Sequence, residues 1–229
     1  MWDGKYKAVT FSYDDGVEQD ERLVRMFRRY GVKATFNLNS GIMTRANFWE
    51  RNGVTIHRMN AARLPEIYEG FEIAVHTLTH PDLTKLDEET VCNEICLDRD
   101  NLERLFGRKI VGFAYPYGTW NENIVRILKE EGFRYARGVD ATGGDCPLDQ
   151  DMMILHPSAH HNFEGLMELA RDFASATPDP ARPRLLYIWG HSYEFDTDRN
   201  WERMEELLRI LSNREDIYYG TNAEVLLGE

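Results

Sequence analysis

Two short segments decide the predicted fold: Thr10-Phe11-Ser12-Tyr13-Asp14-Asp15-Gly16 and His76-Thr77-Leu78-Thr79-His80. The first includes the end of an apolar run at 7–13 and the second follows one at 72–75, and both runs are typical of buried strands. A third apolar run, 184–189, is followed by His191. Because α/β barrels keep their chemistry at the carboxyl ends of their strands, these three run ends predict the rim of a catalytic barrel.

The length and charge of the chain limit what it can be. Its 229 residues fit one domain of barrel size, so we expect a single catalytic domain over 1–229. With 27 Lys and Arg against 39 Asp and Glu, the formal net charge is −12. This argues against nucleic acid or an anionic membrane as a partner, but not against a neutral or cationic sugar polymer. The oligomeric state is not indicated.

The start of the chain and its cysteines predict the compartment. Residues 1–7 contain no apolar stretch of the kind that signal peptides carry, and no run approaches the ~20 apolar residues of a membrane span. Three cysteines, an odd and small number, suggest free thiols: Cys92, Cys96 and Cys146. We therefore expect a cytoplasmic protein, with the trimmed part of an exported protein as the alternative.

Strand and helix patterns alternate along the chain. Helices are expected at 19–30, 61–68, 87–106, 121–131, 163–176 and 201–212. Further strands are expected at 34–38, 109–115, 133–138, 152–155 and 217–219, and 39–60 reads as an irregular excursion above the rim. This alternation favours parallel βαβ units and an α/β barrel.

The paired carboxylates of Asp14 and Asp15 admit two interpretations. Two adjacent like charges are costly unless a cation or a proton neutralises one of them. A bound metal would do so, with one Asp as ligand and the other facing a reacting water. Alternatively, Asp-Asp-Gly after a strand is ordinary turn chemistry.

The histidines of the second segment favour a metal. Spacing i, i+4 places His76 and His80 on one face of a helical turn, so that both imidazoles reach one ion. Thr77 stands where zinc proteases of this spacing carry a Glu base, and Asp14 is available instead. An Asp/His/His set suits zinc, with cobalt, nickel or manganese as alternatives. The competing interpretation is a capped turn before Pro81 with two surface histidines.

These segments resemble the first two motifs of the polysaccharide deacetylases, carbohydrate esterase family four. Pro116-Tyr117-Gly118 is similar to the third motif, and His191 after an apolar strand is similar to the fifth. The resemblance implies a deformed (β/α)7 barrel and metal-dependent removal of acetyl groups from N- or O-acetylated sugars.

By position, the resemblance makes Asp14 the catalytic base and His191 the general acid. The backbone N–H of Tyr117 would help to hold the oxyanion. The divalent metal would be bound by three side chains: Asp15, His76 and His80. The implied partner is an acetylated carbohydrate.

The sequence departs from the family pattern in two places. Ala114 stands where the third motif has an Arg that pairs with the base, and Arg137 is a candidate replacement. The Asp and Trp of the fourth motif are not found as a pair between residues 135 and 155. Glu194, three residues after His191, is a candidate partner for the acid.

Four further side chains are candidates for contacting substrate. Trp120 and Tyr193 lie near the expected rim, where aromatic rings stack on sugar faces. His160 and His161 either line the cleft or are surface histidines before an N-cap at Asn162.

Two alternatives to a sugar deacetylase remain. A hydrolase of another amide, such as a cyclic ureide or an acetylated amine, would use the same barrel. A non-catalytic carbohydrate-binding relative would keep the fold alone, although a binder has no use for a free base beside the metal.

Overall fold

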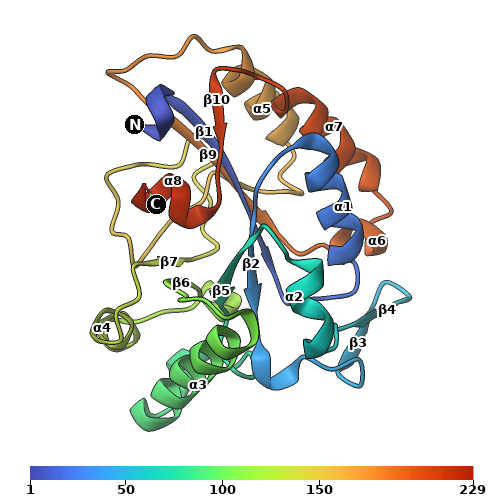
Figure 1. Cartoon of the computed structure of the whole chain (residues 1–229), viewed down its shortest axis with the longest axis vertical. Helices are drawn as coiled ribbons and strands as arrows, with labels where there is room; N and C mark the ends of the chain where they lie inside the picture. The colour runs from blue at the N-terminus through green and yellow to red at the C-terminus, as the bar shows by residue number, and fades with distance from the viewer. Residues whose placement is uncertain (229) are drawn as a thin grey trace.

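A curled sheet of parallel strands forms the centre of the protein (Figure 1). The computed structural model describes residues 1–228. The barrel strands are β1 (Lys7–Asp14), β2 (Thr35–Leu38), β5 (Glu72–Val75), β6 (Gly112–Ala114), β7 (Tyr135–Arg137), β8 (Ala159–His160) and β9 (Arg184–Gly190). Their order is β7-β6-β5-β2-β1-β9-β8, and β10 (Ile217–Tyr219) pairs with the first half of β1. The expected α/β, deformed (β/α)7 architecture is confirmed.

Helices cover the outside of this sheet. They are α1 (Asp20–Tyr30), α2 (Leu64–Ile67), α3 (Glu88–Phe106), α4 (Glu122–Glu130), α5 (Leu166–Ser175), α6 (Glu194–Thr197), α7 (Trp201–Leu211) and α8 (Asn222–Leu227). Asp87 and Asn121 cap α3 and α4 by accepting the N–H groups of Thr90 and Ile124, as expected for residues of these types. In the described part of the chain, no helix is long and apolar enough to cross a membrane.

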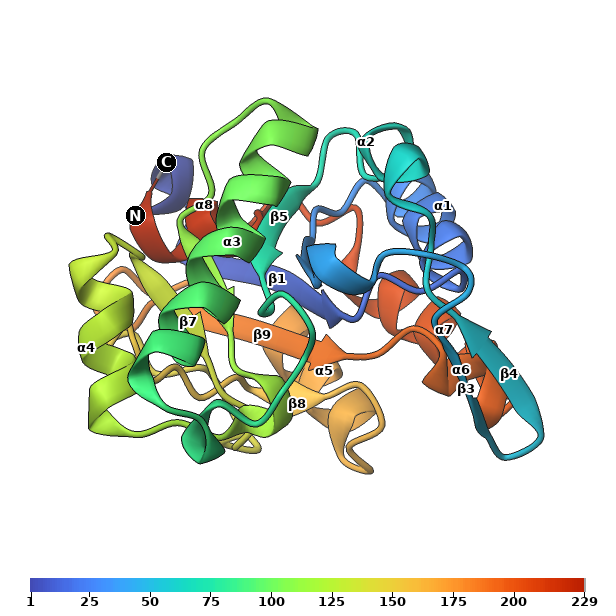
Figure 2. The ribbon, with the colours of Figure 1, turned by 90° about the horizontal axis from the view of Figure 1, so that it is seen from below.

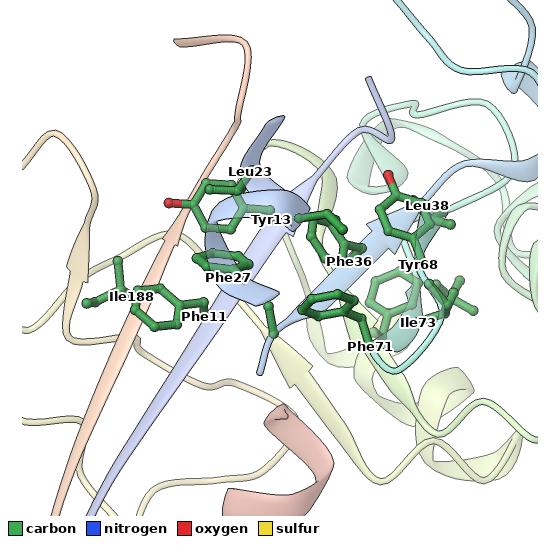
Figure 3. Packing of buried hydrophobic residues seen from close by; sticks show 14 of the residues in the cluster. Phe11, Tyr13, Leu23, Phe27, Phe36, Leu38, Tyr68, Phe71, Ile73 and Ile188 are labelled. Carbon is green, nitrogen blue, oxygen red and sulfur yellow. The ribbon is translucent and has the colours of Figure 1, made fainter. Parts of the chain in front are cut away.

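The main core lies between the parallel strands and the helices that cover them. Leu23 and Phe27 on α1 are fully buried, and Phe27 packs on Phe11 and Tyr13 in the second half of β1 (Figure 3). Burying one such side chain stabilises the fold by about 1.5–3 kcal/mol. This packing holds the carboxyl end of β1, and with it Asp14, in place.

The barrel closes through an irregular segment rather than through the strand expected at 152–155, so that expectation is wrong. Leu155 makes a single parallel bridge to Arg137 of β7. Pro157, which has no N–H to donate, then interrupts pairing, and β8 forms against β9 instead. The chain thus passes from the β7 edge to the β9 edge and links them.

The excursion at 39–60 contains a hairpin that was not predicted. β3 (Phe48–Arg51) and β4 (Val54–His57) pair antiparallel and project from the barrel beside α6 (Figure 2). Asn52 and Gly53 join them at φ +51° and +75°, as a two-residue hairpin turn requires. The Asn-Gly pair was the available signal for this hairpin.

Candidate active site

A cavity of about 400 Å³ opens at the carboxyl ends of the barrel strands. Its lining residues are Asp14, Asp15, His76, His80, Tyr115, Tyr117, Val139, Trp189, His191 and Tyr193. The two segments and the third strand end that were singled out in the sequence therefore meet in one place. Four of these ten residues are tyrosine or tryptophan, and this aromatic part of the wall suits the apolar face of a sugar ring.

The two oxygens of Asp14, at the end of β1, have different surroundings. Oδ1 accepts hydrogen bonds from Asn37 Nδ2 at 2.7 Å and from Arg137 Nη2 at 2.5 Å. Oδ2 faces the cavity side, 4.0 Å from His76 Nε2 and 3.9 Å from His191 Nε2. Arg137 therefore takes the place left by Ala114, as the sequence suggested.

The charge of Asp14 is set by the same neighbours. Burial alone would raise the pKa of this carboxyl, but the charges of Arg137, His76 and His191 outweigh burial and lower the pKa to about 2. Asp14 is therefore an anion at neutral pH, with one oxygen fixed and the other available.

Asp15 is held in an unusual backbone conformation beside an arginine. Its φ is +83°, a region that non-glycine residues rarely occupy and that clusters at functional sites. Arg58 Nη2 lies 3.1 Å from Asp15 Oδ1, and Arg58 Nη1 donates to the Asp15 carbonyl. Burial opposes ionisation of this carboxyl, but the Arg58 charge keeps its pKa below the usual value.

The histidine segment is a loop and not a helical turn, so the expectation of a shared helix face is wrong. Thr77 and His80 have φ values of +68° and +64°, which an α-helix does not allow. The loop is held from outside, because Asp98 and Glu94 on α3 accept the N–H groups of His76 and Thr79. The imidazoles of His76 and His80 are nevertheless in contact, with ring centroids 4.8 Å apart.

Asp15, His76 and His80 form a group that could hold a metal ion, since their ligand atoms all lie within 4.8 Å of one another. His76 Nδ1 donates to the Ala114 carbonyl at 2.7 Å, which leaves the Nε2 lone pair for an ion. Burial lowers the pKa of His76 to about 4, so this ring is neutral at pH 7. These residues fit a divalent cation of the zinc type.

His191 approaches Asp14 Oδ2, the same oxygen that His76 approaches. Its Nδ1 lies 3.4 Å from Glu194 Oε2, at the start of α6. Tyr117 follows β6 with φ +58°, and its exposed ring packs edge-on against His80 at 4.7 Å. Asp15, Thr77, His80 and Tyr117 thus all carry left-handed backbone at this site, which is the pattern of a pre-organised site.

Of the four residues expected to contact substrate, one lines the cavity and three do not. Tyr193 lines the cavity, whereas Trp120 is 37% exposed and lies outside its lining. His160 and His161 also lie outside the lining, next to Glu194 at 3.0 and 3.2 Å. His161 is only 1% exposed, and its ring stacks on Phe195 at 4.2 Å and on Tyr13 at 5.7 Å between centroids.

Sequence reasoning missed several residues that hold the site. Arg58 was inside the excursion, where nothing in the local pattern marks it as a partner of Asp15. Asn37 could have been noticed, because it is a polar residue next to the end of an apolar strand. Asp98 lies on the inner face of the long helix among apolar positions, which is an indication of a buried polar role.

A parallel barrel of this order, with carboxylates and histidines at its carboxyl rim, defines an α/β protein of the (β/α)7 class. The model of the family described as "Polysaccharide deacetylase" matches residues 3–136 of the 229. The chain therefore belongs to the polysaccharide deacetylase family.

Individual relatives are distant. The peptidoglycan-N-acetylglucosamine deacetylase of Bacillus cereus is 29% identical over 132 residues, 55% of this chain and 42% of that protein. The chain spans less than half the length of that curated relative.

Solved structures share the fold. The Xyl-CE4 domain of a multidomain xylanase from the hindgut metagenome of Trinervitermes trinervoides gives a TM-score of 0.61 at 17% identity, covering 98% of this chain and 91% of that one. A family 4 carbohydrate esterase from Streptomyces lividans, in complex with acetate, gives 0.60 at 16% identity, covering 95% and 92%.

Proposed function

We propose that this protein is a metal-dependent hydrolase that removes acetyl groups from N- or O-acetylated sugars. One observation carries the proposal: three metal-ligand atoms lie together beside an ionised carboxylate oxygen, Asp14 Oδ2, that faces the cavity. The sugar part of the proposal is supported by family membership, by the aromatic wall and by the substrate named for the Bacillus cereus relative.

Asp15, His76 and His80 would hold the ion. When bound, a divalent cation supplies Lewis acidity and lowers the pKa of a nearby water. Zinc suits this donor set, and cobalt, nickel or manganese would also fit.

The chain's own residues divide the proton transfers. Asp14 Oδ2 takes the proton of the attacking water, because Arg137 and Asn37 hold Oδ1 and keep the carboxylate anionic. The backbone N–H of Tyr117 is proposed to donate to the oxyanion that develops on the acetyl oxygen. His191 then gives a proton to the departing amine or alkoxide, and an amine needs this proton most because an amide nitrogen is a poor leaving group.

The test measures acetate release from acetylated chitin, peptidoglycan and xylan fragments, with and without a chelator. The variants Asp15→Ala and His76→Ala are compared with the wild type in two ways. Bound zinc is measured by inductively coupled plasma mass spectrometry, and activity is measured as acetate release. We expect both variants to lose metal and acetate release together. Unchanged metal content in both variants would overturn the site, and release that a chelator does not affect would overturn metal dependence.

A further inference from the structure

Four side chains surround the carboxylate of Glu194, just outside the cavity. Oε2 lies 3.0 Å from His160 Nε2, 3.2 Å from His161 Nε2 and 3.4 Å from His191 Nδ1. Oε1 lies 3.2 Å from Arg51 Nη1, which reaches across from the β3–β4 hairpin. We call these five residues the Glu194 cluster. The mechanism above uses only His191 of them.

The cluster has the composition of a second metal site. The ligand atoms of His160, His161 and Glu194 lie within 4.8 Å of one another, as do those of Asp15, His76 and His80. Composition and spacing therefore do not distinguish the two groups. The hydrogen bonds of the imidazole rings show which group has nitrogen lone pairs free to bind an ion.

The second ring nitrogen separates the two groups. His76 Nδ1 donates its proton to a carbonyl, so its Nε2 carries a free lone pair. His160 Nδ1 instead accepts the backbone N–H of Asn162 at 3.1 Å. The proton of a neutral His160 ring must then be on Nε2, which faces Glu194. His160 Nε2 is a donor to the carboxylate and has no lone pair to offer an ion.

We infer that Glu194 is the positioning residue for the acid His191, and that His160 and Arg51 hold Glu194 in place for this task. The inference rests on the proposed function, because it assigns a role within that site. With Nδ1–H directed at Glu194, the other nitrogen of His191, Nε2, faces Asp14 and the cavity.

The surroundings of Glu194 keep it charged. Its side chain is 8% exposed, so burial opposes ionisation, but the neighbouring imidazoles outweigh burial and hold its pKa well below the usual range. Burial lowers the pKa of His161 to about 4, so this ring stays neutral and does not compete with His191 for the charge of Glu194. The anion is therefore available to stabilise a protonated His191.

The inference also accounts for the missing fourth motif. No Asp from the 135–155 region contacts His191 in the described residues; the carboxylate partner comes instead from α6, three residues along the chain. The hairpin contributes Arg51, whose guanidinium also lies over the Tyr193 ring at 5.6 Å. A segment that looked like an excursion in the sequence thereby reaches the acid side of the site.

The test uses Glu194→Gln, which keeps the volume and removes the charge, in the zinc-loaded full chain. We expect kcat for acetate release to fall about 10- to 100-fold, with KM and zinc content nearly unchanged. Glu194→Asp should restore part of the loss. Glu206→Gln, at a half-exposed ion pair on α7, is the matched control and should behave as the wild type.

A second readout does not depend on activity. In protein with ¹⁵N-labelled histidine, recorded at an alkaline pH where the His191 ring is neutral, this ring should carry its proton on Nδ1 in the wild type and shift toward the Nε2–H form in Glu194→Ala. Should that variant not fold, Arg51→Gln, at a residue whose side chain is 45% exposed, should cause a smaller shift in the same direction. Arg45→Gln, which removes an exposed ion pair to Glu18, is its control.

The outcomes separate the two proposals. A wild type that releases no acetate from any substrate contradicts the proposed function, while the histidine spectra still test Glu194. An active wild type whose kcat and His191 tautomer are unchanged by the Glu194 substitutions overturns the inference alone. Two bound zinc ions per chain, the second lost in His160→Ala, would also overturn it.

Discussion

At the scale of single residues, Asp14 shows how buried neighbours can occupy one oxygen of a carboxylate and leave the other available. Its side chain is 3% exposed, and Oδ1 is used by Asn37 and Arg137 while Oδ2 is left toward the cavity. A free aspartate would present both oxygens equally to water. The fixed pair therefore determines which oxygen can act as a base.

Arg137 should matter for both folding and catalysis. Arg137→Ala leaves the Asp14 charge buried without its partner, so we expect about 3–5 kcal/mol less free energy of unfolding and a large loss of kcat. Arg137→Lys, which keeps the charge, should lose less of both. Urea unfolding and acetate release measure the two effects. Arg171→Ala, at an exposed pair with Glu206, is the control and should change stability by less than ~1 kcal/mol. Equal stability of the two alanine variants would contradict this account.

The lowered pKa of Asp14 predicts a pH dependence of stability. An acid with a pKa of about 2 when folded and 3.8 ordinarily adds stability above pH 4, which is lost as the pH falls toward 2. The shift corresponds to about 2 kcal/mol. Chelator-treated wild type should therefore lose about 2 kcal/mol more between pH 4 and pH 2 than Asp14→Asn does. If the free energy of unfolding, measured by chemical denaturation, changes with pH in the same way in both proteins, the pKa of Asp14 is not lowered in the folded state.

At the scale of elements, α3 holds the 76–80 loop, which carries two of the proposed metal ligands, in its conformation. Asp98 accepts the N–H groups of Ser40 at 2.6 Å and His76 at 3.2 Å, and Glu94, one turn earlier, accepts Thr79 N–H at 2.8 Å. Left-handed residues such as Thr77 and His80 cost energy that surrounding contacts must offset. The helix therefore supports a loop conformation that local sequence does not favour.

Asp98→Ala should loosen this loop without removing a ligand. We expect zinc affinity to fall about 10- to 100-fold, the range typical when a residue that orients a metal ligand is removed. Competition with a chromophoric chelator measures the affinity. Asp100→Ala, two residues away and exposed, is the matched control. This role of α3 would be refuted by Asp98→Ala protein that is folded and binds zinc as tightly as the control.

At the scale of the whole molecule, the barrel brings together segments that are far apart in the chain. Asp14 ends β1, His76 and His191 follow β5 and β9, and parallel strands end on the same rim. The site therefore exists only in the folded barrel, and an ion that binds it binds the native state alone.

Zinc should consequently stabilise the whole domain. At 100 times its Kd, the ion should add about 2.7 kcal/mol, which corresponds to a rise in Tm of about 5–10 °C. Thermal unfolding monitored by circular dichroism measures this rise. Magnesium, which prefers oxygen ligands, should stabilise the protein much less. Asp15→Ala protein that shows the same rise would place the stabilising ion elsewhere.

The local elements were predictable because their signals are local. The strands at 35–38, 72–75 and 217–219 fall within expected runs, and α1, α3 and α4 begin near their expected caps. Apolar periodicity and capping depend on neighbouring residues, so one sequence suffices to see them. The strand expected at 152–155 was wrong because its pairing depends on distant edges, which local pattern does not reveal.

The sequence by itself determined most of the alternation of strands and helices, the residues at the carboxyl ends of three strands, and the family they resemble. Only the tertiary structure decided which charges meet: Arg137 with Asp14, Arg58 with Asp15, and Arg51 with Glu194. The reason is physical. The partner of a side chain depends on which distant segments the folded barrel places beside it. Loops with left-handed residues, such as 76–80, persist only because contacts from other elements stabilise them.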